Sequence, residues 1–145
     1  MPEVIFKDVY KTPGALEILF ALLKERQPDT NISHRRMPSW TEHARFVRSK
    51  PYRFWHFIHV PKEKKPVGAV YLSKMNEIGL FIFKKHRGKG RGEAVLSCLL
   101  KKYAVKGRLL ANINPKNKKS IRFFQRAGFA HIQNTYEFRK PRGRK

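Results

Sequence analysis

The chain has 145 residues, and its 33 Lys and Arg residues against 10 Asp and Glu residues give a formal net charge of +23. This length predicts one domain that buries about two-thirds of its unfolded surface without disulfide or metal staples. The single cysteine excludes an internal disulfide. No Cys/His cluster has the spacing of a structural zinc site, and no window of about 18 apolar residues could span a membrane. We therefore expect a metal-free cytoplasmic protein without a signal peptide, whose charge attracts polyanions and phosphate-bearing small molecules.

The N-terminal segment is predicted to form a short strand and then a helix. Residues 3–9 have the strand pattern, and Thr12-Pro13 supply an N-cap followed by proline at the first helical position. Apolar residues at helical spacing predict a helix that ends near Arg26, before the polar loop 27–38.

A capping box marks the start of the second helix, which is predicted over residues 40–49. The Ser39 hydroxyl can accept from the backbone N–H three residues on, and the Glu42 carboxylate can accept from the Ser39 N–H in return. We interpret Glu42 as a capping residue and not as a catalytic carboxylate.

Three consecutive antiparallel strands are predicted next, over residues 52–60, 67–73 and 77–83. Alternation along the first of them divides its side chains between two faces. Tyr52, Phe54, His56 and Ile58 are expected on one face, and Arg53, Trp55, Phe57 and His59 on the other.

A glycine-rich basic turn, residues 84–92, joins the third strand to a helix predicted over residues 92–106. Glycines at three alternate positions let successive backbone N–H groups point into one concavity, and the following helix N-terminus adds positive potential. Five of the nine residues are Lys or Arg, which strengthens the preference for phosphate. The spacing fits neither the Walker pattern nor the dinucleotide-binding glycine pattern.

The remaining elements complete an alternating pattern. A strand over residues 108–113 is expected to run parallel to 77–83, because a helix crosses over between them. A helix over 117–127 and a last strand over 129–138 follow. Residues 139–145 form a basic tail that we expect to be disordered. Cys98, on the predicted helix 92–106, is expected to be a core or near-core thiol.

Two segments carry a family resemblance. Arg87-x-x-Gly90-x-Gly92 resembles the Arg/Gln-x-x-Gly-x-Gly/Ala pyrophosphate loop of the GNAT superfamily of acyl-CoA N-acyltransferases. The stretch from Asn117 to Gly128-Phe129 is similar to that family's second coenzyme-contacting helix and its closing Gly-Phe.

The resemblance implies an α/β fold and a domain organisation. We expect a single GNAT-like N-acetyltransferase domain over residues 1–138, followed by the tail 139–145. Its sheet would be mixed but mostly antiparallel, with six to seven strands, about four helices and a splayed parallel strand pair. Between the splayed strands, 77–83 and 108–113, the pantetheine arm of acetyl-CoA, the co-substrate, would pass.

The resemblance also implies binding residues. The coenzyme-binding set is Ile82, Phe83, Arg87, Gly88, Lys89, Gly90, Arg91, Gly92, Asn117, Ser120 and Phe124. Since the region between the first two helices borders the acceptor in this family, His34, Arg35 and Arg36 are candidates for acceptor binding, with a solvated basic loop as the alternative.

Both positions that usually supply acid–base groups in this family are neutral here. Phe124 stands where many members have a tyrosine that protonates the departing thiolate, and Asn112 stands where a carboxylate base is common. We therefore nominate Glu77 as the base and Tyr136 as the acid. The alternative for Glu77 is a strand-end carboxylate paired with a surface lysine.

The leading functional hypothesis is an acetyl-CoA-dependent N-acetyltransferase that acts on a small amine, as a monomer or homodimer. The segment from Trp40 to Gly79 loosely resembles members that acetylate nucleotide-linked amino sugars, which predicts a phosphorylated or nucleotide-linked acceptor. Two alternatives stay open. One is an acetyltransferase for a nucleic acid or a nucleic-acid-associated protein, and the other is a non-catalytic basic module that binds nucleic acid electrostatically.

Overall fold

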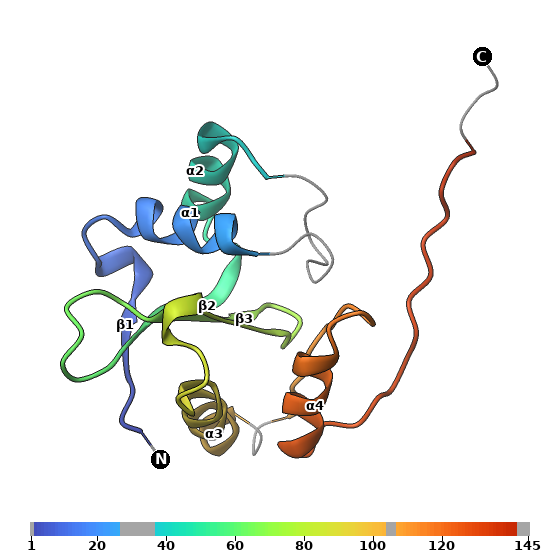
Figure 1. The fold of residues 1–145 in the computed structure, drawn as a ribbon. Coiled ribbons are helices and arrows are strands. Elements are labelled where there is room, and N and C mark those ends of the chain that lie inside the picture. Colours follow the sequence, from blue (N-terminus) through green and yellow to red (C-terminus); the bar gives the residue numbers. More distant parts are fainter. Residues whose placement is uncertain (1, 27–36, 104–106, 142–145) are drawn as a thin grey trace.

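The computed structural model describes residues 2–26, 37–103 and 107–141. A four-stranded antiparallel sheet, in the order β1-β2-β3-β4, lies between helices on its two faces (Figure 1). The elements are β1 (Ile5–Asp8), η1 (Val9–Lys11), α1 (Ala15–Glu25), α2 (Trp40–Arg48), β2 (Tyr52–His59), β3 (Gly68–Ser73), β4 (Ile78–Ile82), η3 (Lys84–His86), α3 (Arg91–Tyr103) and α4 (Lys118–Arg126). The three predicted antiparallel strands and all four predicted helices are confirmed.

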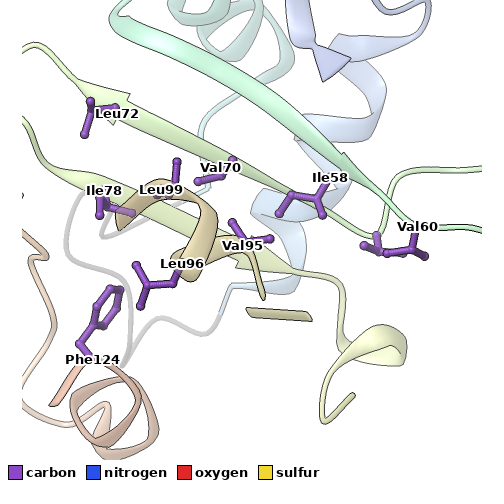
Figure 2. Close-up of a cluster of buried hydrophobic side chains, with 10 residues drawn as sticks. Ile58, Val60, Val70, Leu72, Ile78, Val95, Leu96, Leu99 and Phe124 are labelled. Atoms are coloured by element: carbon purple, nitrogen blue, oxygen red, sulfur yellow. The ribbon is translucent and has the colours of Figure 1, made fainter. Parts of the chain in front are cut away.

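Each face of the sheet has its own apolar core, because side chains alternate between the faces along every strand. Helices α1 and α2 cover the face that buries Phe57 of β2 and Ala69 of β3. Helices α3 and α4 cover the other face, where Val70 and Leu72 of β3 and Phe124 of α4 belong to one buried cluster (Figure 2). The described helices include none that is long and apolar enough to cross a bilayer.

A β-bulge at the start of β2 changes the predicted facing of one aromatic ring. Tyr52 pairs with Ser73 and Phe54 pairs with Leu72. The chain therefore advances two residues on β2 where it advances one residue on β3. A bulge shifts the side chains before it to the opposite face. Tyr52 therefore lies on the same face as Trp55, and its predicted place beside Phe54 is wrong.

The two predicted N-caps have different outcomes. The capping box of α2 is present, since the Glu42 N–H donates to Ser39 Oγ at 3.1 Å and the Ser39 N–H donates to Glu42 Oε1 at 3.0 Å. Helix α1, in contrast, has Gly14 as its N-cap, with a φ of 73°. Thr12 does not cap it, because the Thr12 hydroxyl donates to the Asp8 carbonyl of the preceding turn at 2.8 Å.

The predicted sheet of six to seven strands is wrong, because the described residues form four. Residues 108–113 run parallel to the third predicted strand as expected, but they pair at one bridge only, between Glu77 and Leu110. Residues 129–138 form no strand, and the chain leaves the body of the protein after Phe129 (Figure 1). The alternating pattern of these residues indicates strand propensity. A strand also needs a neighbouring strand to pair with, and the local sequence does not specify one.

Cys98 is exposed, so its expected place in or near the core is wrong. Helix α3 buries Ala94, Val95, Leu96 and Leu99. Cys98 lies one turn after the buried Ala94, so its place on the helical wheel favours burial, and only the packing around the helix leaves it exposed.

Candidate functional site

The glycine-rich turn between β4 and α3 is held in place from both sides. At its start, the Lys84 N–H donates to the Glu25 carboxylate at the end of α1, at 2.8 Å. Arg87 folds back, and its Nε donates to the Ile82 carbonyl at 2.9 Å. Gly88 and Gly90 have φ of 77° and 76°, a left-handed conformation that L side chains rarely adopt.

Helix α3 begins directly at this turn and presents unpaired backbone donors. The Ala94 N–H donates to the Gly90 carbonyl at 3.2 Å, which makes Gly90 the first residue of the helical bonding pattern. By helix geometry, the N–H groups of Arg91, Gly92 and Glu93 have no intrahelical acceptor. A Cβ on Gly92 would lie 3.3 Å from the Phe123 ring of α4, so the missing side chain also lets α3 and α4 approach closely.

A cavity of about 990 Å³ opens in front of the turn, and we call it the groove. The turn and the start of α3 form one wall, α4 forms the opposite wall, and β4 with the end of α1 closes the inner end. Its charged lining consists of eight cations, namely Arg26, Arg87, Arg91, Lys116, Lys118, Lys119, Arg122 and Arg126, against Glu25 and Glu93. The groove is therefore a strongly cationic surface, suited to phosphate groups.

His86 fixes one of these cations. The ring is 6% exposed, and burial lowers its pKa; Glu63 opposes this shift, and the nearby Arg91, Lys85 and Lys89 add smaller lowering effects. A neutral ring leaves a lone pair on Nδ1, which accepts from Arg91 Nη1 at 3.1 Å. Arg91 also lines the groove, so the buried histidine orients a cation toward it.

The edge of β4 that faces the groove has free backbone groups. Phe83 donates its N–H toward β3, to the Val67 carbonyl at 2.8 Å, whereas Ile78 donates away from β3, to the Leu110 carbonyl at 2.8 Å. Because these directions alternate along an antiparallel strand, Leu80 points its N–H and C=O away from β3, on the side of the groove that it lines. Leu80 was not among the predicted site residues, although the alternation of backbone directions along the strand carries this signal.

A second cavity, of about 250 Å³, lies between α1, α2 and the sheet, and we call it the aromatic pocket. Tyr52 and Tyr71 stack in it with ring centroids 3.8 Å apart and an interplanar angle of 3°. Trp55 meets Tyr52 edge-on at 4.7 Å. The other lining residues are Leu19, Leu22, Leu23, Arg26, Pro38, Glu42, His43, Phe46, Ala69 and Phe81.

Gly79 makes room for the Tyr71 ring. The two residues are partners across β3 and β4, and a Cβ on Gly79 would lie 2.0 Å from Cε2 of Tyr71. The ring therefore occupies the space that any other residue at position 79 would fill. Burial raises the pKa of Tyr71 and of Tyr52, so both phenols stay protonated and neutral.

Arg26 and Phe81 line both cavities and mark their junction. The Arg26 guanidinium lies over the Phe81 ring, with its central carbon 4.1 Å from the ring centroid. Burial lowers the pKa of Arg26, and the Tyr71 and Tyr52 hydroxyls oppose this shift. Arg26 was predicted only as the end of a helix, because nothing in the local sequence pattern distinguishes it from other arginines.

The predicted coenzyme-binding residues fall into two groups. Those that line the groove are Ile82, Arg87, Gly88, Gly90, Arg91, Gly92, Asn117 and Ser120. Phe83, Lys89 and Phe124 are not part of its lining. Phe124 is 9% exposed and belongs to the core between the sheet and helices α3 and α4 (Figure 2).

The predicted acid–base residues lie outside both cavities. The Glu77 carboxylate accepts from Ser73 Oγ at 3.0 Å and from the side-chain amide of Asn112. Tyr136 is 88% exposed on the segment that leaves the body of the protein. His34, Arg35 and Arg36 lie outside the described residues. Within the described ranges, no three His, Cys, Asp or Glu side chains are placed to hold a metal ion.

Comparisons with known proteins agree with this geometry. A family model described as "Acetyltransferase (GNAT) family" matches residues 19–129, which include every lining residue of both cavities. No curated protein sequence matches the chain.

Solved structures with the same fold are numerous. A domain from Methanocaldococcus jannaschii is 26% identical with a TM-score of 0.78, and the alignment covers 94% of each chain. An acetyltransferase from Thermus thermophilus is 19% identical with a TM-score of 0.65, over 92% of each chain. A putative acetyltransferase from Salmonella typhimurium, solved with acetyl-CoA, is 17% identical with a TM-score of 0.62, over 89% of this chain and 79% of that one. At such low identity, the last two likenesses show the fold alone.

Proposed function

The chain belongs to the GNAT acetyltransferase family, and we propose that it transfers an acetyl group from acetyl-CoA to a primary amine of a small acceptor. The observation that carries this proposal is the groove. Its glycine turn, helix N-terminus and eight cations suit the coenzyme's phosphates, and its inner end meets a second cavity at Arg26 and Phe81. Donor and acceptor would therefore meet at this junction.

The open edge of β4 supports the same reaction. An extended pantetheine arm can pair with the free N–H and C=O of Leu80, as an added strand would. When the amine nitrogen bonds to the thioester carbon, the carbonyl oxygen gains negative charge, and a backbone N–H at this edge is the donor that we assign to it. The C–S bond then breaks, the sulfur leaves as a thiolate, and the nitrogen, now part of an amide, releases its extra proton to solvent.

The thiolate has no tyrosine at the position that usually protonates it. Phe124 has no hydroxyl and is buried in the core. A thiol pKa of about 8.5 makes the thiolate a tolerable leaving group, so its proton can come from solvent that reaches the open groove. Positioning of the two reactants supplies the remaining rate enhancement.

Replacing Glu77 with Gln should leave kcat/KM within about threefold of wild type. The carboxylate is held by Ser73 and Asn112 at the start of the strand, where it lines neither cavity. Its role in this arrangement is to fasten segment 108–113 beside β4. A general base, by contrast, would cost about 100-fold or more on removal. Such a loss in a variant with an unchanged unfolding midpoint would reinstate Glu77 as the base.

We further propose that the acceptor carries an anionic group beside its amine-bearing part. Eight cations against two carboxylates exceed what the coenzyme's phosphates neutralise, and Arg26 stands where the acceptor must enter. A phosphorylated or nucleotide-linked amine of the amino-sugar type, as expected from the sequence, is one member of this class.

An amine screen monitored by thiol release tests the proposed function. Wild-type protein should release thiol from acetyl-CoA with at least one amine of the screen and without metal. The Gly90→Glu variant, with its groove blocked, is the matched control and should release none. Absence of both acetyl-CoA binding and thiol release in the wild-type protein would refute the proposed activity.

Electrostatic binding of nucleic acid is a second candidate function, favoured by the net charge of +23 and by the row of cations on α4. We expect weak, sequence-independent binding to duplex DNA whose log affinity falls by about 0.9 per phosphate contact per decade of salt. Deleting residues 139–145, which hold five cations, should weaken binding and reduce this slope, while turnover on small amines stays nearly unchanged.

A salt titration of both proteins on the same duplex measures this slope. Undetectable turnover on every small amine, combined with acetylation of an amine held on nucleic acid or on a nucleic-acid-associated protein, would favour that substrate class instead.

A further inference from the structure

The aromatic pocket has the lining that a flat ring requires. The rings of Tyr52, Trp55, Tyr71 and Phe81 line it together with three leucines of α1, and Trp55 meets the stacked Tyr52 edge-on. Such surfaces bind aromatic groups by stacking and edge-on contact in addition to burial of apolar area. One lining carboxylate, Glu42, is already engaged by the Ser39 N–H at 3.0 Å.

The size of the pocket limits what enters. Its volume of about 250 Å³ lies below the roughly 300–1,000 Å³ of sites for drug-sized ligands. One ring system fits this space, whereas a nucleotide with its sugar and pyrophosphate does not.

Arg26 supplies a site for an anion at the mouth of the pocket. Its guanidinium is half-buried against the Phe81 ring, and among the described residues no carboxylate lies within ion-pair distance of it. A cation withdrawn from water in this way gains from an anionic partner. A carboxylate or phosphate on a bound acceptor would be that partner, and the fork of guanidinium N–H groups suits it.

The positions of the groove, Arg26 and the aromatic pocket determine how the amine, the anion and the ring must be arranged on the acceptor. The amine must reach the junction, because the thioester lies on the groove side. The anion must also lie at the junction, because Arg26 is there. The ring must point away from both, into the pocket.

Resting on the function proposed above, we propose that the acceptor is an aromatic amine with an anionic group next to its amine, as in an aromatic amino acid. In a nucleotide-linked amino sugar, the flat base is separated from the amine by a sugar and phosphates. Such an acceptor could place its base in the aromatic pocket or its amine at the junction, but not both at once.

Three matched probes separate the ring from the anion. Phenylalanine has amine, carboxylate and ring, phenethylamine lacks the carboxylate, and alanine lacks the ring. Acetylation is followed by thiol release, and binding is measured separately by calorimetry with coenzyme A present. We expect phenylalanine to exceed each of the other two by about tenfold or more in kcat/KM and in affinity.

Two variants test which side chains recognise the carboxylate and the ring of the acceptor. Arg26→Met keeps an unbranched side chain but removes the charge, and it should abolish the preference for phenylalanine over phenethylamine. Trp55→Leu should reduce the preference for phenylalanine over alanine by about tenfold. Arg45→Met, an exposed arginine of α2 outside both cavities, is the matched control and should change neither preference.

The outcomes are distinguishable from a failure of the proposed function. Acetylation of a nucleotide-linked amino sugar in preference to phenylalanine would overturn the aromatic acceptor while the acetyltransferase stands. Equal binding of phenylalanine and alanine to the coenzyme-bound protein would also overturn it, whether or not any thiol is released. Preferential binding of phenylalanine without transfer would support the pocket and reject the reaction.

Discussion

Replacing Gly90 with Glu should abolish acetyl-CoA binding and leave the fold intact. Gly90 lies at the mouth of the turn with a φ of 76°, and an added Cβ would meet nothing closer than 3.7 Å, so a side chain fits at the cost of backbone strain. That strain is about 1–2 kcal/mol. The new carboxylate would stand among the groove's cations, where it takes the place of a phosphate and repels the coenzyme. Calorimetry with acetyl-CoA, beside a denaturant titration, measures both effects.

Two further variants separate strain from blockage. Gly14 has a φ of 73° and lies outside the groove, so Gly14→Glu carries similar strain and charge and should bind acetyl-CoA normally. Gly90→Ala carries the strain without the carboxylate and should bind more weakly than wild type but detectably. Wild-type affinity in the Gly90→Glu protein would show that the coenzyme does not use this turn.

Replacing Gly79 with Ala should collapse the aromatic pocket without affecting the groove. The added methyl would lie 2.0 Å from Tyr71 Cε2 and 2.1 Å from its Cζ, so the ring must leave its stack on Tyr52. Overpacking of this kind lowers the free energy of unfolding by about 1–3 kcal/mol. The near-ultraviolet circular dichroism of the Tyr52–Trp55–Tyr71 cluster should change, and acceptor binding should weaken by about tenfold or more. Acetyl-CoA affinity should stay constant, since Gly79 does not line the groove.

A double-mutant cycle identifies Tyr71 as the cause. With Tyr71→Ala in place, the methyl at position 79 no longer meets a ring, so Gly79→Ala should then cost little. The coupling free energy between the two sites should be about 1–3 kcal/mol. Additive losses would mean that Gly79 is required for another reason, such as its backbone conformation.

The sequence correctly predicted the features that depend on residues close together in the chain. The capping box at Ser39 depends on residues three apart, and the turn from Gly88 to Gly92 depends on left-handed backbone that glycine favours, so both were legible in the sequence. The prediction of a last strand was wrong, because residues 129–138 have the alternating pattern of a strand but no pairing partner in the described structure. The bulge that turns Tyr52 toward Trp55 depends on the register between two strands, and the sequence of one strand does not contain it.

The same division holds for the site. The groove was largely predictable, because its turn and the helix beginning near Asn117 carry motifs with fixed spacing. The aromatic pocket was not, because it draws Arg26, Tyr52, Tyr71 and Phe81 from four elements that only tertiary packing brings together. Glu77 looked catalytic from its place on a strand, but its hydrogen bond to Asn112 joins residues 35 apart.

The segment that follows Phe129 makes ionic strength a determinant of the protein's colloidal stability. It holds Ile132, Tyr136 and Phe138 at 60%, 88% and 89% exposure on an extended backbone, the kind of template to which a second chain adds as a strand. At low ionic strength the net charge of +23 keeps separate molecules apart. The range of that repulsion shrinks from about 10 Å at 0.1 M salt to about 3 Å at 1 M, so concentrated salt removes the barrier to self-association through these exposed side chains.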